Sequence, residues 1–484
     1  MMGSESRSDP LLCPGRNCRL LSRFHRLAFL IDGRAYFEAL IAALPKAERR
    51  IVILGWDFDG RTPLRPYLAP DRPDSDEVMP LGRFLRSLVE IRRELEVHVL
   101  IWRNSIFYGS NPLPVSLLGP EWWQHPRIHF RLDDHHPVGA SHHQKIVCAD
   151  EKIAFIGGMD LTQGRWDDAD HAPDQPARLD TFGKPYPPVH DIQIVVDGDA
   201  AAAIAGVAAD RWRYATGEPL EPVAVGTDPW PDTVAPALRD QTIAVARTQP
   251  PHGEQPEVRE IEALNTSLLE AADDYIYIET QYFSLPAITD ILIRHLQRTD
   301  GPEIVLVVTQ KSSGVIEQYV MAENRDRLFK LLRGSDPFGR LRMYFPVSCP
   351  EPMCEIKIHS KLFIIDDRLL KAGSSNVNAR SMGLDSECDL AYAAEGDDAR
   401  QTVRALRDAL LAEHLGVTPD LFAQTYDRAG SLIVAVEALN RGTRRLVPYI
   451  IEDRATEVSL TPGSSILDPS QPLGSMLSKL TNSQ

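Results

Sequence analysis

The sequence contains no run of 18 consecutive apolar residues, which excludes a hydrophobic helix long enough to span a bilayer. Its N-terminus lacks a basic start followed by a long apolar segment, so we expect no signal peptide. The six cysteines do not have the spacing of a disulfide framework, which favours a reducing compartment. Together these absences predict a cytoplasmic protein whose contact with membranes is peripheral.

Positive charge is also scarce. The chain has 52 Lys and Arg against 68 Asp and Glu, a net charge of −16. A protein that follows a phosphate backbone normally relies on a positive surface, so this balance disfavours nucleic acid as a partner. It also disfavours adhesion to anionic lipid through overall charge. The sequence has no EF-hand loop of the D-x-[DN]-x-[DN]-G type, so calcium dependence is not indicated.

What the sequence does contain is a repeated motif of the form H-x-K-x4-D. A single copy arises by chance in roughly a few per cent of chains this long. Here the offset that maps the first copy onto the second also maps the loop 157–160 (GGMD) onto 373–376 (GSSN). Two copies in register, each with its glycine loop, indicate a duplication. The copies consist of His143, Lys145 and Asp150, and of His359, Lys361 and Asp366.

The duplication predicts two similar halves, and strand and helix patterns alternate along both. We therefore expect an α/β fold: two similar halves, each a mostly parallel sheet with helices on its faces, with one active site between them. Five prolines and two glycines between residues 217 and 240 mark a linker. The expected segments are a flexible arm (1–25), a first half (26–216), the Pro-rich linker (217–240), a second half (241–456) and a weakly ordered tail (457–484).

Each motif begins on a predicted strand. Side chains alternate across a strand, so His359 and Lys361 share one face about 7 Å apart. An imidazole and an ammonium then line the same surface. Asp150 and Asp366 fall at strand ends, where Asp commonly makes turns, so a structural role is favoured for them over a catalytic one. His142 should face away from His143 and is interpreted as structural.

Two other groups of residues have a structural interpretation as well as a functional one. The sequence Asp133-Asp134-His135-His136 could be a metal cluster, but neighbouring side chains on an extended segment point away from each other, so a solvated turn is favoured. Aromatic and apolar residues between 103 and 127 either pack over the edge of the sheet, which we favour, or form a rim that touches lipid.

The two motifs, together with the segments 141–167, 276–283 (IYIETQYF) and 373–387 (GSSNVNARSMGLDSE), resemble the phospholipase D superfamily. The surrounding residues are similar to the catalytic core of eukaryotic-type phospholipases D and their bacterial relatives. The resemblance runs from about residue 25 to about residue 415. One departure is Val189, which precedes His190 where family members often carry Trp; it affects the substrate groove rather than the reaction.

The resemblance implies a reaction in which one neutral His attacks phosphorus and the other acts as general acid and then base. By resemblance His143 is the nucleophile, which forms a phosphohistidine, and His359 the acid and base; the sequence alone leaves this assignment open. No cofactor and no catalytic metal are implied.

The resemblance also assigns supporting residues. Each imidazole needs a partner on its second nitrogen. Glu387, downstream of His359, matches the family's carboxylate in the second half, and Asp191 is the candidate for the first half. Asp160 aligns with Asn376 but cannot donate a hydrogen bond when ionised, so a structural role for it is left open. Expected ligands of the substrate phosphate are Lys145, Lys361, Ser374 and Asn376.

The implied activity is that of a phospholipase D. It would hydrolyse, or transfer to an alcohol, the phosphatidyl group of a glycerophospholipid such as phosphatidylcholine at a membrane surface. A cardiolipin synthase-type phosphatidyltransferase is the nearest alternative, and a nuclease is disfavoured by the acidic balance. A non-catalytic binder is disfavoured because both motifs keep their His and Lys. The oligomeric state stays open.

Overall fold

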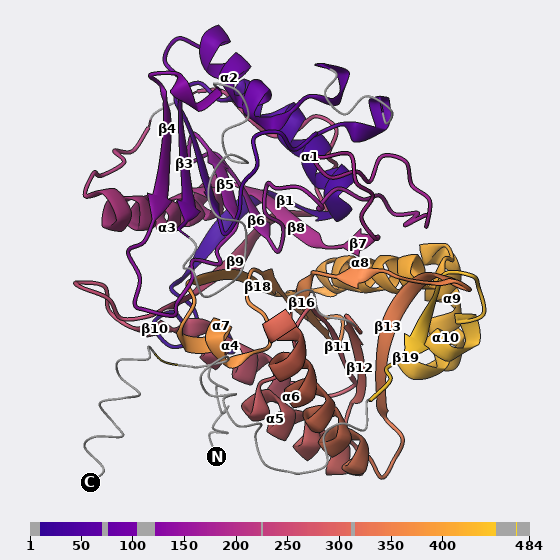
Figure 1. Cartoon of the computed structure of the whole chain (residues 1–484). Coiled ribbons are helices and arrows are strands. Elements are labelled where there is room, and N and C mark those ends of the chain that lie inside the picture. Colours follow the sequence, from indigo (N-terminus) through magenta and orange to yellow (C-terminus); the bar gives the residue numbers. More distant parts are fainter. Residues whose placement is uncertain are drawn as a thin grey trace, which may run out of the picture.

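The computed structural model describes residues 10–69, 76–103, 122–223, 226–310, 315–451 and 471. Two lobes lie one above the other (Figure 1), with the first half coloured indigo to magenta and the second red-brown to yellow. Most of the aromatic stretch 103–127, the first nine residues of the expected arm and nearly all of the expected tail lie outside the described residues.

One continuous sheet runs through both halves. In the first half the strands lie side by side in the order β4-β3-β2-β5-β6-β8-β1, and in the second in the order β9-β18-β17-β16-β11-β12-β13-β19. The bounds in the first half are β1 (Leu20–Ile31), β2 (Arg50–Gly55), β3 (Glu96–Trp102), β4 (Ile128–Asp133), β5 (Ile146–Ala149), β6 (Ile153–Gly157) and β8 (Ile192–Asp197). Those in the second half are β9 (Leu238–Gln249), β11 (Tyr275–Thr280), β12 (Glu303–Val308), β13 (Leu341–Pro350), β16 (Lys361–Ile365), β17 (Leu369–Gly373), β18 (Glu387–Ala393) and β19 (Arg445–Pro448).

The order of strands repeats about the junction between β1 and β9, which pair antiparallel with Leu20 opposite Val245 and Leu27 opposite Leu238. Reading outward from that junction, each strand of the first half has a counterpart in the second. This arrangement confirms the predicted α/β fold of two similar halves. The motif strands β5 and β16 occupy equivalent central positions.

The expectation of a mostly parallel sheet is wrong. Only the pairs β2–β3, β3–β4, β11–β12 and β12–β13 are parallel within the large sheet. The motif strands turn directly into β6 and β17, and a tight turn joins antiparallel neighbours, whereas parallel strands need a longer crossover. The sheet is therefore mixed.

The expected flexible arm extends too far. Residues 20–25 belong to β1, and Phe24 and Leu27 are fully buried. Residues 20–24 pair with β9, and residues 27–31 of the same strand pair with β8, so β1 joins the halves. Its apolar residues interleave with Arg and His, and this pattern hid the strand. Likewise, the last residues of the predicted linker already belong to β9.

Helices cover both faces of the sheet. Long helices α3 and α8 pack in one core with strands of both halves, whereas α1 and α2 cover the other face of the first half, and α4 to α6 that of the second. None of the helices in the described ranges is both long and apolar enough to cross a membrane. The helices are α1 (Asp32–Ala43), α2 (Leu81–Ile91), α3 (Gly198–Thr216), α4 (Glu260–Glu270), α5 (Pro286–Gln297), α6 (Val315–Gly334), α7 (Ala379–Gly383), α8 (Asp397–Leu415), α9 (Pro419–Ala429) and α10 (Leu432–Leu439).

Two short features complete the fold. Trp122 packs against Phe58 and Phe130 and is 2% exposed, which confirms the packing interpretation for this residue. Strands β7 (Val189–His190) and β15 (Lys357–Ile358) form a separate parallel pair that links the two halves. The remaining short strands are β10 (Val258–Arg259) and β14 (Met353–Glu355).

Candidate active site

Each motif histidine is held by the backbone of the opposite half. The backbone N–H of His143 donates to the carbonyl of Ser386, at 2.9 Å, and that of His359 donates to the carbonyl of His190, at 2.8 Å. In both cases the residue that follows the acceptor is a carboxylate, Glu387 or Asp191. The main chain therefore delivers each carboxylate to the histidine of the other half.

The side chains follow the backbone. His143 Nδ1 lies 3.0 Å from Glu387 Oε2, and His359 Nδ1 lies 2.7 Å from Asp191 Oδ2. We expected each carboxylate to contact the histidine of its own half, Glu387 with His359 and Asp191 with His143. That expectation is wrong. The structure brings both carboxylates to the imidazoles, but with the partners exchanged.

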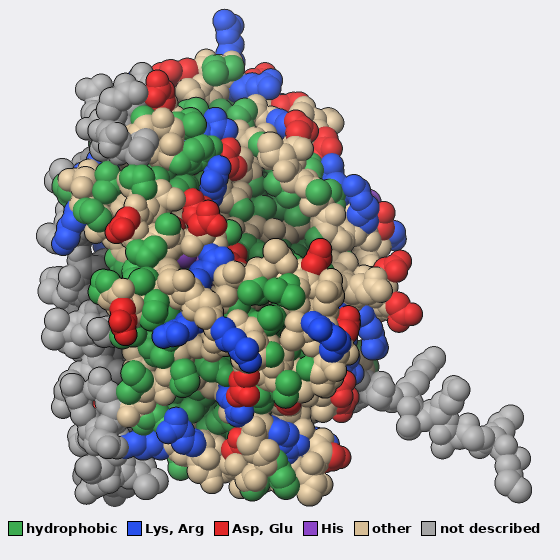
Figure 2. Space-filling model, turned by 90° about the vertical axis from the view of Figure 1, so that its right-hand side faces the viewer, with side chains coloured by type: hydrophobic (Ala, Val, Ile, Leu, Met, Phe, Trp, Pro, Cys, Tyr) green, Lys and Arg blue, Asp and Glu red, His purple; other side chains and the backbone are tan. Residues whose placement is uncertain are grey.

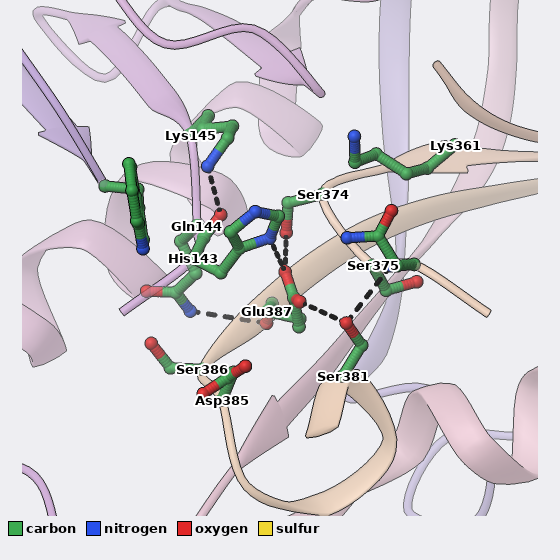
Figure 3. Close-up of polar contacts among 12 residues, drawn as sticks. His143, Gln144, Lys145, Lys361, Ser374, Ser375, Ser381, Asp385, Ser386 and Glu387 are labelled. Atoms are coloured by element: carbon green, nitrogen blue, oxygen red, sulfur yellow. Dashed lines mark hydrogen bonds and ion pairs between the residues drawn. The ribbon is translucent and has the colours of Figure 1, made fainter. Parts of the chain in front are cut away.

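Glu387 lies in a dense set of hydrogen bonds (Figure 3). Ser374 donates to Oε2 at 2.5 Å, and Ser381 donates to Oε1 at 2.7 Å. Burial raises the pKa of Glu387 well above its usual value, although these two hydroxyls oppose the shift. The proton of Ser374 is thus directed at a carboxylate, whereas the sequence suggested that it would face a phosphate.

Asp191 is fixed by the loop of its own half. The N–H of Ile192 donates to Asp191 Oδ1 at 2.8 Å, and burial raises the pKa of the carboxyl to about 7. A Cβ on Gly158 would lie only 2.4 Å from Asp191 Oδ1. Gly158 therefore admits the carboxylate, just as Ser374, its counterpart in the second-half loop, contacts Glu387. In the first half, the anion that the glycine loop approaches is this carboxylate.

The two lysines have unequal surroundings. Lys145 Nζ lies 3.1 Å from Asp160 Oδ2, with both side chains buried, so Asp160 forms an ion pair with the motif lysine. At the position equivalent to Asp160, the second half has the neutral Asn376. Lys361 Nζ instead lies 3.5 Å from Gln281 Oε1, and burial lowers its pKa to about 7.

Asn376 is held through its main chain, whose N–H donates to Ser381 Oγ at 3.1 Å. Its side-chain oxygen is buried and has no hydrogen-bond partner among the described residues. Asn376 is therefore buried in the second-half loop, and its side chain retains hydrogen-bonding capacity.

Both imidazoles lie among cations, His359 buried and His143 partly exposed. Burial, followed by Lys145 and Lys361, lowers the pKa of His143 well below its usual value. Burial, followed by Lys361 and Arg165, does the same for His359. With Nδ1 directed at a carboxylate, a neutral imidazole that carries its proton on Nδ1 leaves Nε2 with a free lone pair. This arrangement suits a nucleophile or a general base.

The motif aspartates have only structural contacts in the structure. Asp150 accepts the backbone N–H groups of residues 48–50 at the start of β2, and Asp366 accepts those of residues 273–275 at the start of β11. Both adopt a positive φ in the turn after a motif strand. Each therefore joins the turn to the neighbouring strand.

Other polar residues near the motifs also take separate partners. His142 Nδ1 lies 2.8 Å from Ser386 Oγ, and its Nε2 lies 3.1 Å from Asp133 Oδ2. Asp133 also accepts from Arg211 Nε at 2.9 Å. Trp102 donates to His136 Nε2 at 2.9 Å. Asp133 and His136 therefore take different partners, as expected of neighbours on an extended segment, but the predicted solvated turn is wrong for Asp133, which ends β4 and is buried.

Sequence reasoning missed three residues of the site. Ser381 contacts Glu387, and Asp385 accepts the N–H of Ser141 at 2.7 Å, which holds the segment before the first motif. The positive charge of Arg165 acts on His359, Lys361 and Asp191. All three lie in segments that carry the family resemblance, but their roles depend on contacts that only the folded chain shows.

Comparison with known proteins extends these findings. A family described as "Cardiolipin synthase, PLD-like domain" matches residues 266–408. "Phospholipase D A" of Dictyostelium discoideum is 23% identical over 474 residues, which cover 82% of this chain and 36% of that protein. "Phospholipase D1" of Saccharomyces cerevisiae is 25% identical over 498 residues, which cover 81% of this chain and 29% of that protein. The match thus spans about a third of the length of these relatives.

A solved structure supports the fold. The crystal structure of phosphatidylserine synthase from Haemophilus influenzae covers 96% of both chains, with a TM-score of 0.55 and 12% sequence identity. At this identity the likeness is one of fold. It extends over both halves, including the sheet that passes between them.

Proposed function

The chain belongs to the phospholipase D superfamily, and we propose that it acts as a phospholipase D on glycerophospholipids such as phosphatidylcholine. The observation that carries the proposal is the pair of exchanged histidine–carboxylate contacts, His143 with Glu387 and His359 with Asp191, flanked by two buried lysines. The products are phosphatidic acid and a free headgroup, or a new phosphatidyl ester when an alcohol is the acceptor.

In the first step, the lone pair on His143 Nε2 forms a bond to phosphorus and the bond to the headgroup oxygen breaks. His359, which in the starting state carries on Nε2 the extra proton of its pair with Asp191, gives that proton to the oxygen, so the headgroup leaves as a neutral alcohol. The side chain of His143 is 17% exposed and that of His359 6%, which supports His143 as the group that reaches phosphorus.

In the second step, His359, now neutral, takes a proton from water or an alcohol. The oxygen attacks phosphorus, and the bond to His143 Nε2 breaks. Asp191 stabilises the imidazolium form of His359 in each cycle, and Glu387 holds the Nδ1 proton of His143. Both histidines return to their starting states.

The cations stabilise charge on the non-bridging oxygens. Lys361 has no carboxylate at hydrogen-bond distance among the described residues, so its charge is available to a phosphate, whereas that of Lys145 is partly neutralised by Asp160. Arg165 adds a third positive charge to the field at His359. No step requires a metal ion.

One alternative rests on a specific finding. The matching family is described as cardiolipin synthase-like, so transfer of the phosphatidyl group to a lipid alcohol is the second candidate. A nuclease is less favoured, because acidic and basic side chains are interspersed on the face shown in Figure 2 and the net charge is −16.

The test uses mixed vesicles of phosphatidylcholine, phosphatidylethanolamine and phosphatidylglycerol with EDTA and a little ethanol, followed by mass spectrometry of the lipids. Formation of phosphatidylethanol with consumption of one headgroup supports the proposal and names the substrate. Cardiolipin formed from phosphatidylglycerol favours the second candidate. The variant His143→Ala should form none of these products. Its matched control is His25→Ala, which changes a histidine on the exposed surface of β1. Unchanged lipids with a folded preparation would overturn both.

A further inference from the structure

A buried cluster of histidines and carboxylates lies next to the His359–Asp191 pair. Asp32 begins α1, His171 lies in the loop after β6, His190 lies in β7, and Glu413 lies near the end of α8. Asp32, His171 and His190 are at most 1% exposed, and the side chain of Glu413 is 9% exposed. Three segments of the first half and one helix of the second therefore meet at one point.

The distances within this cluster match the shell of an ion. His190 Nδ1 lies 2.8 Å from Glu413 Oε1 and 3.1 Å from Asp32 Oδ1, while His171 Nε2 lies 3.2 Å from Glu413 Oε1 and 3.4 Å from Asp32 Oδ2. Ligand atoms about 2.0–2.1 Å from a tetrahedral ion lie about 3.3–3.4 Å from one another. The four histidine–carboxylate distances, from 2.8 to 3.4 Å, are at or below that separation, and all four ligand atoms lie within 4.8 Å of one another.

Two of these atoms lack the hydrogen bonds that burial requires. His190 Nδ1 and Asp32 Oδ2 are buried and have no hydrogen-bond partner among the described residues. For His190 this holds although two carboxylate oxygens lie within 3.1 Å, because neither satisfies the angle of a hydrogen bond.

The outer nitrogens of both histidines are fixed by further carboxylates. His171 Nδ1 lies 2.8 Å from Asp167 Oδ2, and His190 Nε2 lies 3.1 Å from Glu279 Oε2. Histidines that bind metal ions almost always donate their other ring N–H in this way, which sets the tautomer and directs the remaining lone pair inward. Both histidines therefore turn one nitrogen inward: Nδ1 of His190, which has no hydrogen-bond partner among the described residues, and Nε2 of His171, which hydrogen-bonds to Glu413 Oε1 in a contact that an ion would replace.

We propose that Asp32, His171, His190 and Glu413 bind one divalent transition-metal ion, with Zn²⁺ fitting best. Imidazole nitrogens and carboxylate oxygens are both ligands that Zn²⁺ accepts, and here two of each meet in a buried group of four. The ion joins α8 of the second half to the first half. It does not touch the substrate, and the phosphoryl transfer proposed above does not pass through it.

The ion has a positioning consequence for the active site. The N–H of Asp32 donates to the carbonyl of Asp191 at 2.8 Å, and that of Asp191 donates to Asp32 Oδ1 at 3.3 Å. The carbonyl of His190 accepts the N–H of His359. Two ligands of the ion, Asp32 and His190, are therefore hydrogen-bonded to the backbone of Asp191 and His359, the acid–base pair. This consequence depends on the proposed function, whereas metal binding does not.

The competing account is two protonated histidines, which supply the same two positive charges as one divalent ion. Although burial lowers it, the neighbouring Asp32, Asp167 and Glu413 carboxylates raise the pKa of His171 to about 10. A protonated His190 would place its Nδ1 proton between two oxygens without a good hydrogen bond to either. That geometry favours the ion.

The first test is elemental analysis of the whole chain, produced without an affinity tag or chelator in cells supplied with zinc, manganese and iron. We expect about one equivalent of zinc per chain. Protein unfolded in guanidinium with chelator and refolded with Zn²⁺ should regain that equivalent. Fewer than about 0.1 equivalents in both preparations would overturn the proposal.

Variants locate the ion. His171→Ala should reduce bound zinc at least about tenfold, because it removes a ligand. The matched control is His295→Gln, since His295 is also buried and, among the described residues, its ring has a single hydrogen-bond partner, the carbonyl of Leu269. Full zinc content in a folded His171→Ala protein would contradict the assignment. If that variant does not fold, Co²⁺ substituted into the wild-type protein gives the answer: tetrahedral absorption bands support the site, and octahedral ones exclude it.

Discussion

The imidazole of His359, in the second half, is hydrogen-bonded to the carboxylate of Asp191, in the first half, with 2.7 Å between Nδ1 and Oδ2. His143 and Glu387 form the reverse contact at 3.0 Å. Neither half alone holds a complete pair. The exchange makes the junction between the halves itself the reactive site, and it allows the two pairs to be told apart by experiment.

The exchanged contacts predict that variants of the two carboxylates, Asp191 and Glu387, respond differently to a better leaving group. Asp191→Asn should disable the general acid His359 and lower kcat by about 10²- to 10⁴-fold on phosphatidylcholine. With a p-nitrophenyl ester, whose leaving group needs no proton, the burst of nitrophenol in Asp191→Asn should be nearly restored. Glu387→Gln should stay slow with both substrates, because it acts on the nucleophile. If the burst were restored in Glu387→Gln and not in Asp191→Asn, the exchanged histidine–carboxylate pairing would be contradicted.

The covalent intermediate should accumulate when its breakdown is blocked. In His359→Ala the p-nitrophenyl substrate should still phosphorylate His143, but no base then activates water. Mass spectrometry of peptides prepared at alkaline pH should find the adduct on the peptide that contains His143. An adduct on the His359 peptide of His143→Ala would reverse the two roles.

Activity should decline at alkaline pH. Lys361 binds phosphate when protonated, and its pKa is lowered to about 7 by burial; Asp191, raised to about 7 by burial, keeps one proton in its pair with His359. Protonated Lys361 and the protonated Asp191–His359 pair are the active forms, and each loses its proton as the pH rises. The value of kcat/KM should therefore fall above about pH 7. Bound phosphate favours the protonated forms, so kcat should fall at a higher pH.

The check is a pair of pH–rate profiles with a short-chain phosphatidylcholine below its critical micelle concentration, which removes effects of the lipid surface. A value of kcat/KM that stays constant from pH 6 to pH 9 would be incompatible with these pKa values.

Ser374 distinguishes positioning from substrate binding. Its hydroxyl donates to Glu387 at 2.5 Å, so Ser374→Ala should lower kcat by about tenfold, the effect of losing one hydrogen bond to a charged group, with KM little changed. A raised KM with unchanged kcat would show that the hydroxyl binds phosphate, as the sequence suggested.

Gly158 tests how tightly Asp191 must be held. In Gly158→Ala the new Cβ would meet Asp191 Oδ1 at 2.4 Å and the His359 carbonyl at 2.9 Å, so the acid–base pair must move and kcat should fall. Gly206→Ala is the control, because a Cβ there has nothing within 4 Å and Ala favours the helix by about 1 kcal/mol. Equal kcat in both variants would show that the pair tolerates displacement.

The sequence was sufficient for much of this. The repeated motif and its offset predicted the two halves, and both histidines, both lysines, Asp191 and Glu387 lie together as expected. These features depend on residue type and spacing, which a sequence displays directly. The difference between Asp160 and Asn376 was also visible, but its effect, an ion pair on Lys145 and none of that kind on Lys361, needed the folded chain.

The exchange of partners was not visible, because it depends on which backbone segments pair across the junction between the halves. A sequence shows that Glu387 follows His359 more closely than it follows His143, but nearness along the chain is a poor guide when two halves pack face to face. The same limitation concealed the buried cluster around His190, whose members come from four separate segments.

The exchanged contacts also govern when activity can arise during synthesis. His143 is translated 244 residues before Glu387, and ribosomes add about 5–20 residues per second, so the first histidine waits roughly 10–50 s for its partner. Until then, in the nascent first half, His143 lacks its partner Glu387 and Asp191 lacks its partner His359. A growing chain therefore holds neither complete histidine–carboxylate pair, and both pairs form only when Glu387 has left the ribosome and the second half has folded onto the first.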